Sequence, residues 1–579
     1  MHSPIRRALA GLWTYRLDTG GALAALLIVS AAGLAVPYLT GWAIDEGLVA
    51  ADRGIVLTAA VALVGIALVR GLAQFAQGYL AERASQGVAF DLREALFAKL
   101  QRLDSAYYDD AQTGQLVTRV TSDVEQVRSF IGGGVVQLVA AIVLFGGTAA
   151  LLLSINVTLA LVAIAVVPPI AILIARFVRV IQPLFGRVQA TVGRLNTVLQ
   201  ENVAGVRVVR AFAREPSERD RYDDVNGTLR AVTVETVRAR SNTFPVVNLT
   251  SDLGALAIVW VGGTLVYGGT LTLGELVAFN SYLSLLLQPI RTVGMLSASL
   301  ARAAVSAERV YAVLDAAVEV QDAPDAVPLP PLRCRVAFHD VSFHYPGDDD
   351  DVLCGVSLDA RPGETVAILG ETGSGKSTLV ELIPRFYDVT GGRIEIDGHD
   401  IRDVTLDSLR RQVGFVLQDV VLFSGTVRDN IAYGRPDATA AEVVTAAVTA
   451  QADAFIRTLD GGYDASVGER GAGLSGGQRQ RIAIARALLV APRLLILDDS
   501  TSALDTRTES ALLDALGRLI DDRRTTVFVV AQRLSTLRRA DRILVLDGGR
   551  IAARGTHDEL LDGSPLYADL LGSQIEATP

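Results

Sequence analysis

The chain has 579 residues, half of them apolar, and a mean hydropathy of +0.37. This length has room for several domains, and so high a mean hydropathy is unusual for a soluble protein of this size. A formal charge of −10 with no concentrated basic patch argues against nucleic acid as a partner. Cys334 and Cys354 are the only cysteines, which favours a reduced cytosolic setting without a structural disulfide.

The first sixteen residues place Arg6, Arg7 and Arg16 around apolar side chains such as Trp13. This pattern predicts a short amphipathic helix on the inner membrane surface. A cleaved signal peptide is the competing interpretation, because two arginines precede an apolar run. We disfavour it, since the run that follows is long enough to span a bilayer and further spans come after it.

Six apolar stretches are long enough to cross a bilayer, and Pro168 and Pro169 interrupt the fourth. The spans are approximately Gly20–Ile44, Ile55–Tyr79, Ile131–Leu153, Val157–Val178, Val246–Tyr267 and Leu276–Leu296. The segments after the second and fourth spans are long and contain many arginines, which predicts that they are cytoplasmic. Both termini are therefore expected on the cytoplasmic side of a cell membrane, such as the inner membrane of a bacterium.

Polar side chains within the spans predict a substrate cavity, with Arg70, Asp252, Asn280 and Gln288 as the candidates. Charges inside a membrane usually face protein or water, so Arg70 and Asp252 could pair near the inner leaflet. The alternative is that Arg70 extends to the membrane surface while Asp252 lies in the cytosol. The otherwise apolar lining suits an amphiphilic or lipid-like substrate.

The two long cytoplasmic segments predict helices, since they hold few prolines and repeat Leu, Val and Ala at helical spacing. Pro328, Pro330 and Pro331 then mark a linker. Beyond it, short β-branched stretches alternate with helical ones, as in an α/β domain. The predicted domains are a membrane domain at 1–315, a linker at 316–332 and an α/β domain at 333–579.

Residues 370–377 fit the pattern G-x-x-x-x-G-K-[ST] and lie between an apolar strand, Thr365–Leu369, and a helix. In this context the glycines let backbone N–H groups turn toward phosphate oxygens. Lys376 would reach the β and γ phosphates, and the Ser377 hydroxyl would bind Mg²⁺. The only other lysine is Lys99, so a lysine here indicates a need for a compact ammonium group. The predicted ATP-binding residues of this stretch are Gly370, Glu371, Thr372, Gly373, Ser374, Gly375, Lys376, Ser377 and Thr378.

A second glycine-rich stretch opens a helix at Arg479–Leu489 and would receive a γ-phosphate. Its residues are Leu474, Ser475, Gly476, Gly477 and Gln478. Together with the apolar run before Asp498, it matches the signature motif of the ABC ATPases. The whole chain resembles the exporter-type (type IV) half-transporters of that family. The resemblance implies an α-helical six-span membrane domain fused to an α/β P-loop ABC ATPase domain.

The same resemblance implies roles for residues outside the two glycine-rich stretches. Tyr345 resembles the residue that stacks on adenine, and Asp505 lies in a stretch similar to the D-loop. Ser377, Gln418 and Asp498 are the implied Mg²⁺ site, with Gln418 also linking the ion to the membrane domain. ATP and Mg²⁺ are therefore the implied cofactors.

Two cytoplasmic segments, Tyr107–Asp123 and Glu201–Phe212, resemble the coupling regions with which exporters touch their ATPase domains. The plainer interpretation is an ordinary solvated helical hairpin. The family resemblance implies ATP-driven export of an amphiphilic substrate such as a drug, lipid or peptide.

Two positions depart from the family pattern, Asp499 in place of the usual glutamate and Gln532 in place of the usual histidine. Aspartate is one methylene shorter, and a misplacement of about 1 Å can cost ~10²-fold in rate. Glutamine can donate a hydrogen bond but cannot carry charge or shuttle a proton. The chain is therefore expected to bind MgATP well and to hydrolyse it slowly, like the degenerate half of a heterodimeric exporter.

ABC sites form between two chains, and the intact signature of this chain would complete the site of its partner. The expected partner is a second, different half-transporter that carries the missing glutamate and histidine. Three alternatives remain at this stage: a slow homodimer, an importer with the exporter fold, and an ATP-gated channel or regulatory subunit.

Overall fold

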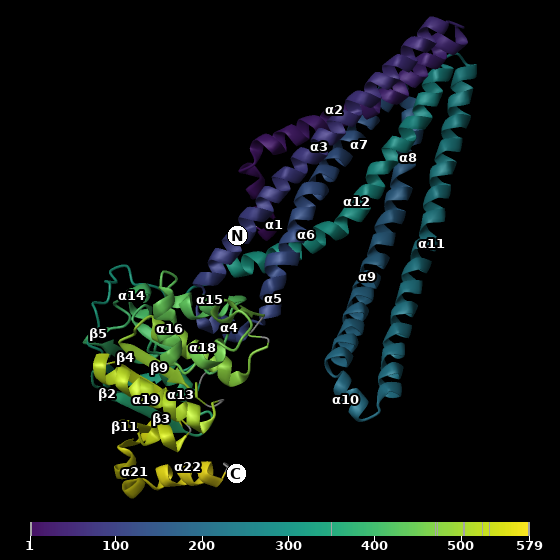
Figure 1. The fold of residues 1–579 in the computed structure, drawn as a ribbon. Coiled ribbons are helices and arrows are strands. Elements are labelled where there is room, and N and C mark those ends of the chain that lie inside the picture. Colours follow the sequence, from purple (N-terminus) through teal and green to yellow (C-terminus); the bar gives the residue numbers. More distant parts are fainter. Residues whose placement is uncertain are drawn as a thin grey trace. The chain divides into compact units, whose positions relative to one another are not determined.

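The computed structural model describes residues 3–348, 350–468, 471, 473–501, 504–523, 525–531 and 533–576. The chain divides into two compact units, shown in Figure 1. The helical unit consists of Met1–Gln101 and Thr113–Ala316, and the α/β unit of Arg102–Gln112 and Ala317–Pro579. A short piece from the N-terminal half of the chain therefore belongs to the C-terminal unit.

Six long apolar helical segments in the described part of the chain confirm the six predicted spans. They are Arg16–Val49, Arg53–Arg102, Thr113–Ile155, Val157–Ala204, Glu215–Tyr267 and Leu273–Leu314. The helices of this unit are α1 (Pro4–Ala10), α2 (Arg16–Trp42), α3 (Arg53–Arg102), α5 (Thr113–Thr118), α6 (Val124–Ser129), α7 (Val135–Ile155), α8 (Val157–Ala165), α9 (Val167–Ala204), α10 (Val206–Ala211), α11 (Glu215–Tyr267) and α12 (Leu273–Leu314).

The fourth span is interrupted where the prolines predict it. Helix α8 ends at Ala165 and α9 begins at Val167, so that Pro168 and Pro169 fall in the first turn of α9. Proline is tolerated in a first turn because the N–H that it lacks would have no helical partner there. The break therefore costs few backbone hydrogen bonds.

The second predicted coupling segment forms the tip of a long helical hairpin. Helices α9 and α11 run side by side, and the short helix α10 connects their ends (Figure 1). Val208 and Phe212 at this tip are exposed. The predicted helical segment with a short turn is thus present, with an apolar tip.

At the N-terminus, the predicted short helix is α1, which is held to the end of α12. The Arg7 guanidinium binds the Asp315 carboxylate and lies 4.1 Å from the centre of the Tyr311 ring. Trp13, in the turn after α1, is 79% exposed. An exposed tryptophan beside arginines suits the interface of a membrane.

An ion pair with a buried carboxylate joins the long segment after the second span to α12. Asp123 ends a π-helical turn, Arg119–Asp123, and is only 2% exposed. Its carboxylate accepts hydrogen bonds from Ser306 Oγ at 2.8 Å and from Arg309 Nε and Nη2 at 2.9 and 2.6 Å. A buried carboxylate is stable only with such partners, so this pair fixes the position of the segment along α12.

The α/β unit contains a six-stranded sheet in the order β12-β11-β3-β10-β9-β6, a four-stranded sheet in the order β2-β1-β4-β5, and the pair β7-β8. Its strands are β1 (Val336–Phe343), β2 (Leu353–Ala360), β3 (Thr365–Gly370), β4 (Gly391–Ile396), β5 (His399–Asp400), β6 (Val413–Val416), β7 (Gly425–Thr426), β8 (Ser466–Val467), β9 (Leu494–Asp498), β10 (Thr526–Val530), β11 (Arg542–Asp547) and β12 (Arg550–Gly555). Its helices are α4 (Ser105–Asp110), α13 (Lys376–Glu381), α14 (Leu406–Arg410), α15 (Val427–Ile431), α16 (Ala440–Thr449), α17 (Asp453–Ile456), α18 (Gly476–Leu489), α19 (Thr506–Arg523), α20 (Leu534–Leu537), α21 (His557–Gly563) and α22 (Pro565–Glu576).

The middle of strand β3, Val366–Leu369, is apolar because both of its faces are buried. Val366 and Ile368 pack into one hydrophobic core, and Ala367 and Leu369 pack into the other. Strands β3, β10, β9 and β6 are parallel neighbours, so their carboxyl ends meet at one edge of the sheet. The phosphate-loop residues follow β3 at this edge, and Asp498 ends β9 there.

The linker predicted from its prolines has few regular elements, but it is held along the α/β unit. Leu329 N donates to Ser408 Oγ at 2.8 Å, and Leu332 N donates to Gln412 Oε1 at 2.9 Å. Val327 forms an isolated parallel bridge with Val404. The linker therefore lies along the surface around α14 and is fixed there by hydrogen bonds.

Candidate nucleotide-binding site

A pocket of about 320 Å³ opens at the carboxyl end of β3, between the loop that precedes α13 and the ends of β9 and β10. Its lining residues are Tyr345, Val352, Thr372, Gly373, Gly375, Lys376, Ser377, Thr378, Gln418, Asp498, Asp499 and Val530. Most of the residues predicted to bind ATP and Mg²⁺ are thus brought together. Gly370, Glu371 and Ser374 complete the loop behind this lining.

The loop depends on glycine at the positions where the motif requires it. Gly373 and Gly375 have φ values of +85° and +95°, a region that other L-residues rarely adopt. At Gly375 a side chain would also lie only 2.8 Å from Leu353 Cδ2 and 3.0 Å from the Val352 carbonyl oxygen. A glycine-rich loop of this kind can direct backbone N–H groups toward a phosphate.

Lys376 and Ser374 supply polar groups that fit a phosphate. Lys376 Nζ donates to the carbonyl oxygens of Gly370 at 3.0 Å and Glu371 at 2.6 Å. Burial lowers the pKa of this ammonium, and the nearby Asp498 and Asp499 carboxylates oppose that shift. The buried Ser374 hydroxyl has no hydrogen-bond partner among the described residues. A phosphate would offer acceptors to both groups.

Two of the three side chains expected to hold Mg²⁺, Ser377 and Asp498, lie together at the end of β9. Ser377 Oγ donates to Asp498 Oδ1 at 3.1 Å, and Asp498 is 3% exposed. Burial raises the pKa of Asp498, while the Ser377 hydrogen bond and the Lys376 charge lower it. Gln418 is exposed on the pocket wall. Hydroxyl, carboxylate and amide oxygens are suitable ligands for Mg²⁺.

Tyr345 follows the end of β1, and its ring forms part of the pocket wall. The ring packs edge-on against Phe343 and Tyr387, with centroids 5.0 and 5.3 Å away. Its hydroxyl lies 2.9 Å from Thr378 Oγ1. An aromatic ring held in this way can present a face to adenine.

Asp499 lines the pocket next to Asp498 and has a left-handed backbone, with φ of +42°. Aspartate and asparagine tolerate this conformation better than most non-glycine residues. Burial and the Asp498 charge raise the pKa of Asp499, whereas the Arg533 and Lys376 charges lower it. The other position that departs from the family, Gln532, lies outside the described residues.

The signature stretch forms the N-terminus of α18. Ser475 is its N-cap, with a reciprocal capping box in which Ser475 N donates to Gln478 Oε1 at 2.8 Å and Gln478 N donates to Ser475 Oγ at 3.3 Å. Ser475 is exposed. Leu474 and the glycines Gly476 and Gly477 flank it, and none of the five lines the pocket among the described residues. Asp505 accepts from Thr508 N at 2.9 Å in the first turn of α19.

The four cavity candidates in the spans, Arg70, Asp252, Asn280 and Gln288, are all exposed in the single chain. Among the described residues, no ion pair joins Arg70 to Asp252. The intramembrane pair considered from the sequence is therefore not formed within one chain.

The sequence motifs did not reveal Glu381, which occupies the last turn of α13 among apolar neighbours. Burial, Asp498 and Asp109 raise the pKa of this carboxyl group to about 7. The only sequence signal is a glutamate inside the otherwise apolar run from Leu379 to Ile383.

Glu381→Gln is expected to stabilise the nucleotide-free protein at alkaline pH. Because the pKa of Glu381 is higher in the folded chain than its ordinary value of 4.5, folded stability falls as pH rises from about 4.5 to about 7. The variant should lose this part of the pH dependence and gain about 1–2 kcal/mol at pH 8. Thermal midpoints between pH 5 and 8 measure the effect.

Glu395→Gln is the matched control, because Arg393 lowers the pKa of Glu395. It should lose stability at pH 8, whereas Glu381→Gln should gain it. If the thermal midpoint of Glu381→Gln has the same pH dependence as that of the unmodified protein, the raised pKa of Glu381 is contradicted.

Comparison with known proteins agrees with this geometry in both units. The family description "ABC transporter transmembrane region" matches residues 20–290, and "ABC transporter" matches residues 353–502. The uncharacterized ABC transporter ATP-binding protein YknU of Bacillus subtilis (strain 168) is 39% identical over 566 residues, 97% of this chain and 96% of that protein.

The ATP-dependent lipid A-core flippase of Desulfotalea psychrophila is 36% identical over 561 residues, covering 96% of this chain and 97% of that protein. The solved structure of a bacterial Atm1-family ABC exporter with ATP bound has a TM-score of 0.81 and 32% identity, covering 96% of this chain and 98% of that one. The fold and the pocket define a membrane transporter with its own nucleotide-binding domain. The chain belongs to the ABC transporters, as an exporter half-transporter that joins a six-span membrane domain to an ABC ATPase domain.

Proposed function

We propose that this chain is one subunit of a heterodimeric ATP-driven exporter, in which its own site retains MgATP and hydrolyses it slowly. The observation that carries the proposal is Asp499. It stands on the pocket wall beside Asp498, where exporters of this family usually have a glutamate. Its shorter side chain draws the carboxylate back from an attacking water, and such a displacement costs about 10²-fold in rate.

The left-handed backbone at this position supports the specialisation. With φ of +42°, residue 499 favours aspartate over glutamate, since aspartate is one of the few side chains that tolerate this region. The short carboxylate and the local backbone are therefore consistent with one another. Gln532 is a second departure, a neutral amide where the family pattern has a histidine.

The exposed and fully capped signature supports a second role in the site of another subunit. Ser475 is exposed and caps α18, and the half-buried Gly476, Gly477 and Gln478 form its first turn, where they can meet the phosphate loop of a partner. We assign the glutamate and the histidine that this chain lacks to that partner, whose site would carry out most of the turnover. Mg²⁺ would be held by Ser377, Gln418 and Asp498.

The transported substrate is proposed to be amphiphilic, a drug, lipid or peptide. Lipid A-core flippases are among the relatives that match nearly the whole chain, and the spans here are largely apolar. Arg70, Asp252, Asn280 and Gln288 are exposed in the single chain and are proposed to line the substrate pathway. Both termini are proposed to lie in the cytosol, which the long arginine-bearing segments support.

The test is to purify this chain alone and together with a candidate partner and to compare their ATPase activity. The pair should be active, and Asp499→Asn in the pair should change turnover by less than about twofold, because a poor base is being removed. Asp498→Asn is the matched carboxylate control and should abolish MgATP retention at this site. A lone chain that forms a stable dimer with full activity would refute the heterodimer, and a loss of about 100-fold in Asp499→Asn would show that Asp499 is the base.

A further inference from the structure

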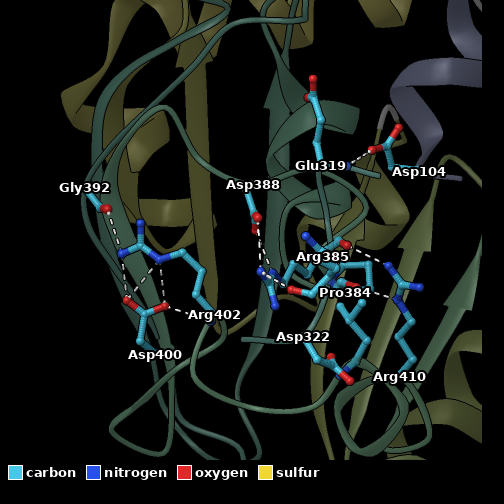
Figure 2. Close-up of polar contacts among 12 residues, drawn as sticks. Asp104, Glu319, Asp322, Pro384, Arg385, Asp388, Gly392, Asp400, Arg402 and Arg410 are labelled. Atoms are coloured by element: carbon cyan, nitrogen blue, oxygen red, sulfur yellow. Dashed lines mark hydrogen bonds and ion pairs between the residues drawn. The ribbon is translucent and has the colours of Figure 1, made fainter. Parts of the chain in front are cut away.

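The chain enters the α/β unit by two routes, and these meet at one turn. The first route is residues 102–112, which contain α4 and connect α3 to α5. The second is the linker that follows α12 and begins at Ala317. The turn where they meet, Arg385–Asp388, begins a few residues beyond the end of α13, the helix that follows the phosphate loop. Figure 2 shows Asp104 of the first route beside Glu319 of the second, with Arg385 and Asp388 near them.

Three hydrogen bonds close a ring through these three segments. Glu319 N donates to Asp104 Oδ2 at 2.8 Å and joins the linker to the segment that contains α4. Arg385 Nη2 donates to the Gln321 carbonyl oxygen at 3.2 Å and joins the turn to the linker. Tyr387 Oη donates to Asp109 Oδ2 at 2.7 Å and joins the turn to α4. We call the six residues the junction.

The turn is held rigidly against α13. Phe386 N donates to the carbonyl oxygen of Glu381, the last residue of α13, at 3.2 Å, and Arg385 N donates to the Leu382 carbonyl oxygen at 3.1 Å. Arg385 is 4% exposed, has φ of +56°, and its Nε donates to Asp388 Oδ1 at 2.6 Å. Arg410 donates to the carbonyl oxygens of Pro384 and Arg385 at 3.1 and 2.7 Å (Figure 2). A strained backbone persists only where its surroundings fix it in this way.

The junction also contacts the end of the nucleotide pocket where Tyr345 lies. The ring of Tyr387 packs edge-on against Tyr345, whose own ring lines the pocket. The turn is therefore connected to the phosphate end of the pocket through α13, which is about 9 Å long, and to the adenine end through Tyr345. In addition, Arg385 Nη1 is buried without a hydrogen-bond partner among the described residues. A buried donor without a partner indicates strain or a function.

We propose that the junction transmits nucleotide occupancy to both segments that connect the α/β unit to the membrane helices, the linker as well as the α4 segment. This inference rests on the proposed function as an ATP-driven transporter and assigns Asp104 and Arg385 as positioning residues for coupling. The linker is then part of the transmission and not only a tether.

Asp104→Asn isolates the bond between the two routes. In the unmodified chain Asp104 Oδ1 accepts from Tyr107 N at 3.3 Å as the N-cap of α4, and Oδ2 accepts from Glu319 N. Asparagine caps helices as well as aspartate does, but it has a single acceptor oxygen. The variant can therefore keep the cap and lose the bond to the linker.

Arg385→Lys tests the turn itself, because one ammonium group cannot reproduce the fork that holds Asp388 and Gln321 together. Arg402→Lys is the matched control. Arg402 holds Asp400 with Nε at 3.1 Å and Nη2 at 2.7 Å and donates to the Gly392 carbonyl at 3.3 Å (Figure 2). Those partners lie outside the junction.

The experiment uses the assembled transporter in lipid nanodiscs, with spin labels at Val157→Cys, the first residue of α8, and at the corresponding position of the second subunit. The measured quantity is the fraction of molecules whose label separation changes when MgATP and vanadate are added. In Asp104→Asn and Arg385→Lys this fraction should fall about fivefold or more, while the Kd for ATP stays within about twofold. Arg402→Lys should switch like the unmodified protein.

Switching in both junction variants that equals the Arg402→Lys control would overturn the inference. A loss of switching accompanied by an equal loss of ATP binding would also overturn it, because the junction would then serve only the fold of the site. If the unmodified assembly does not respond to MgATP at all, the proposed function fails instead.

Discussion

Replacing Lys376 by alanine is expected to lower the affinity of this chain's site for ATP by about 100-fold. The Lys376 ammonium is largely buried at the base of the pocket and rests on the Gly370 and Glu371 carbonyl oxygens. When ATP binds, it can turn to the β and γ phosphates, a charge-assisted contact that alanine cannot make. Retention of labelled ATP by the purified assembly, after rapid removal of free nucleotide, measures the change.

Lys99→Ala provides the matched control, since Lys99 is the only other lysine in the chain and lies on α3. That variant removes the same charge without touching the pocket, and its ATP retention should equal that of the unmodified protein. Equal retention in Lys376→Ala would mean that the pocket does not bind nucleotide through its phosphates.

Ser475→Arg is expected to abolish turnover of the assembled transporter, with a loss of about 100-fold or more. Ser475 begins α18 at an exposed position, and we place it against the γ-phosphate bound by the partner. A long arginine there would fill the space of that phosphate. Because the partner's site is proposed to carry most of the turnover, the effect on ATPase activity should be larger than that of any change to Asp499.

Part of that loss could come from the helix cap alone, which is worth about 1 kcal/mol. Thr439→Arg removes a comparable capping box, formed by Thr439 and Glu442 at the start of α16, and controls for this effect. Thr439→Arg should leave ATPase activity within about twofold of the unmodified transporter. Comparable losses in the two variants would assign the effect to folding and not to the partner's site.

The parts of the site that could be predicted from the sequence are those set by local backbone chemistry. Gly373 and Gly375 appear in the motif because their φ values are positive, and Ser475 and Gln478 are spaced to form a capping box. The break before Pro168 follows from the missing N–H of proline. Each of these features depends on residues only a few positions apart, so the sequence pattern contains the whole cause.

The parts that could not be predicted depend on contacts between distant segments. Asp104 and Glu319 are joined across more than two hundred positions, and Asp123 meets Arg309 over a similar separation. No local pattern marks such pairs. Glu381 has a raised pKa because of what surrounds it in the folded chain, and the left-handed backbone of Asp499 depends on its neighbours at the sheet edge.

The insertion of residues 102–112 into the α/β unit has a consequence for exchanging parts between transporters. Ala106 of α4 packs against the core that contains Tyr387, so a fragment that begins at the linker would leave an apolar surface and the Tyr387 hydroxyl in water. A chimaera that takes its ATPase half from a relative must therefore take that relative's version of residues 102–112 as well. The chain therefore passes between the helical unit and the α/β unit three times along its sequence.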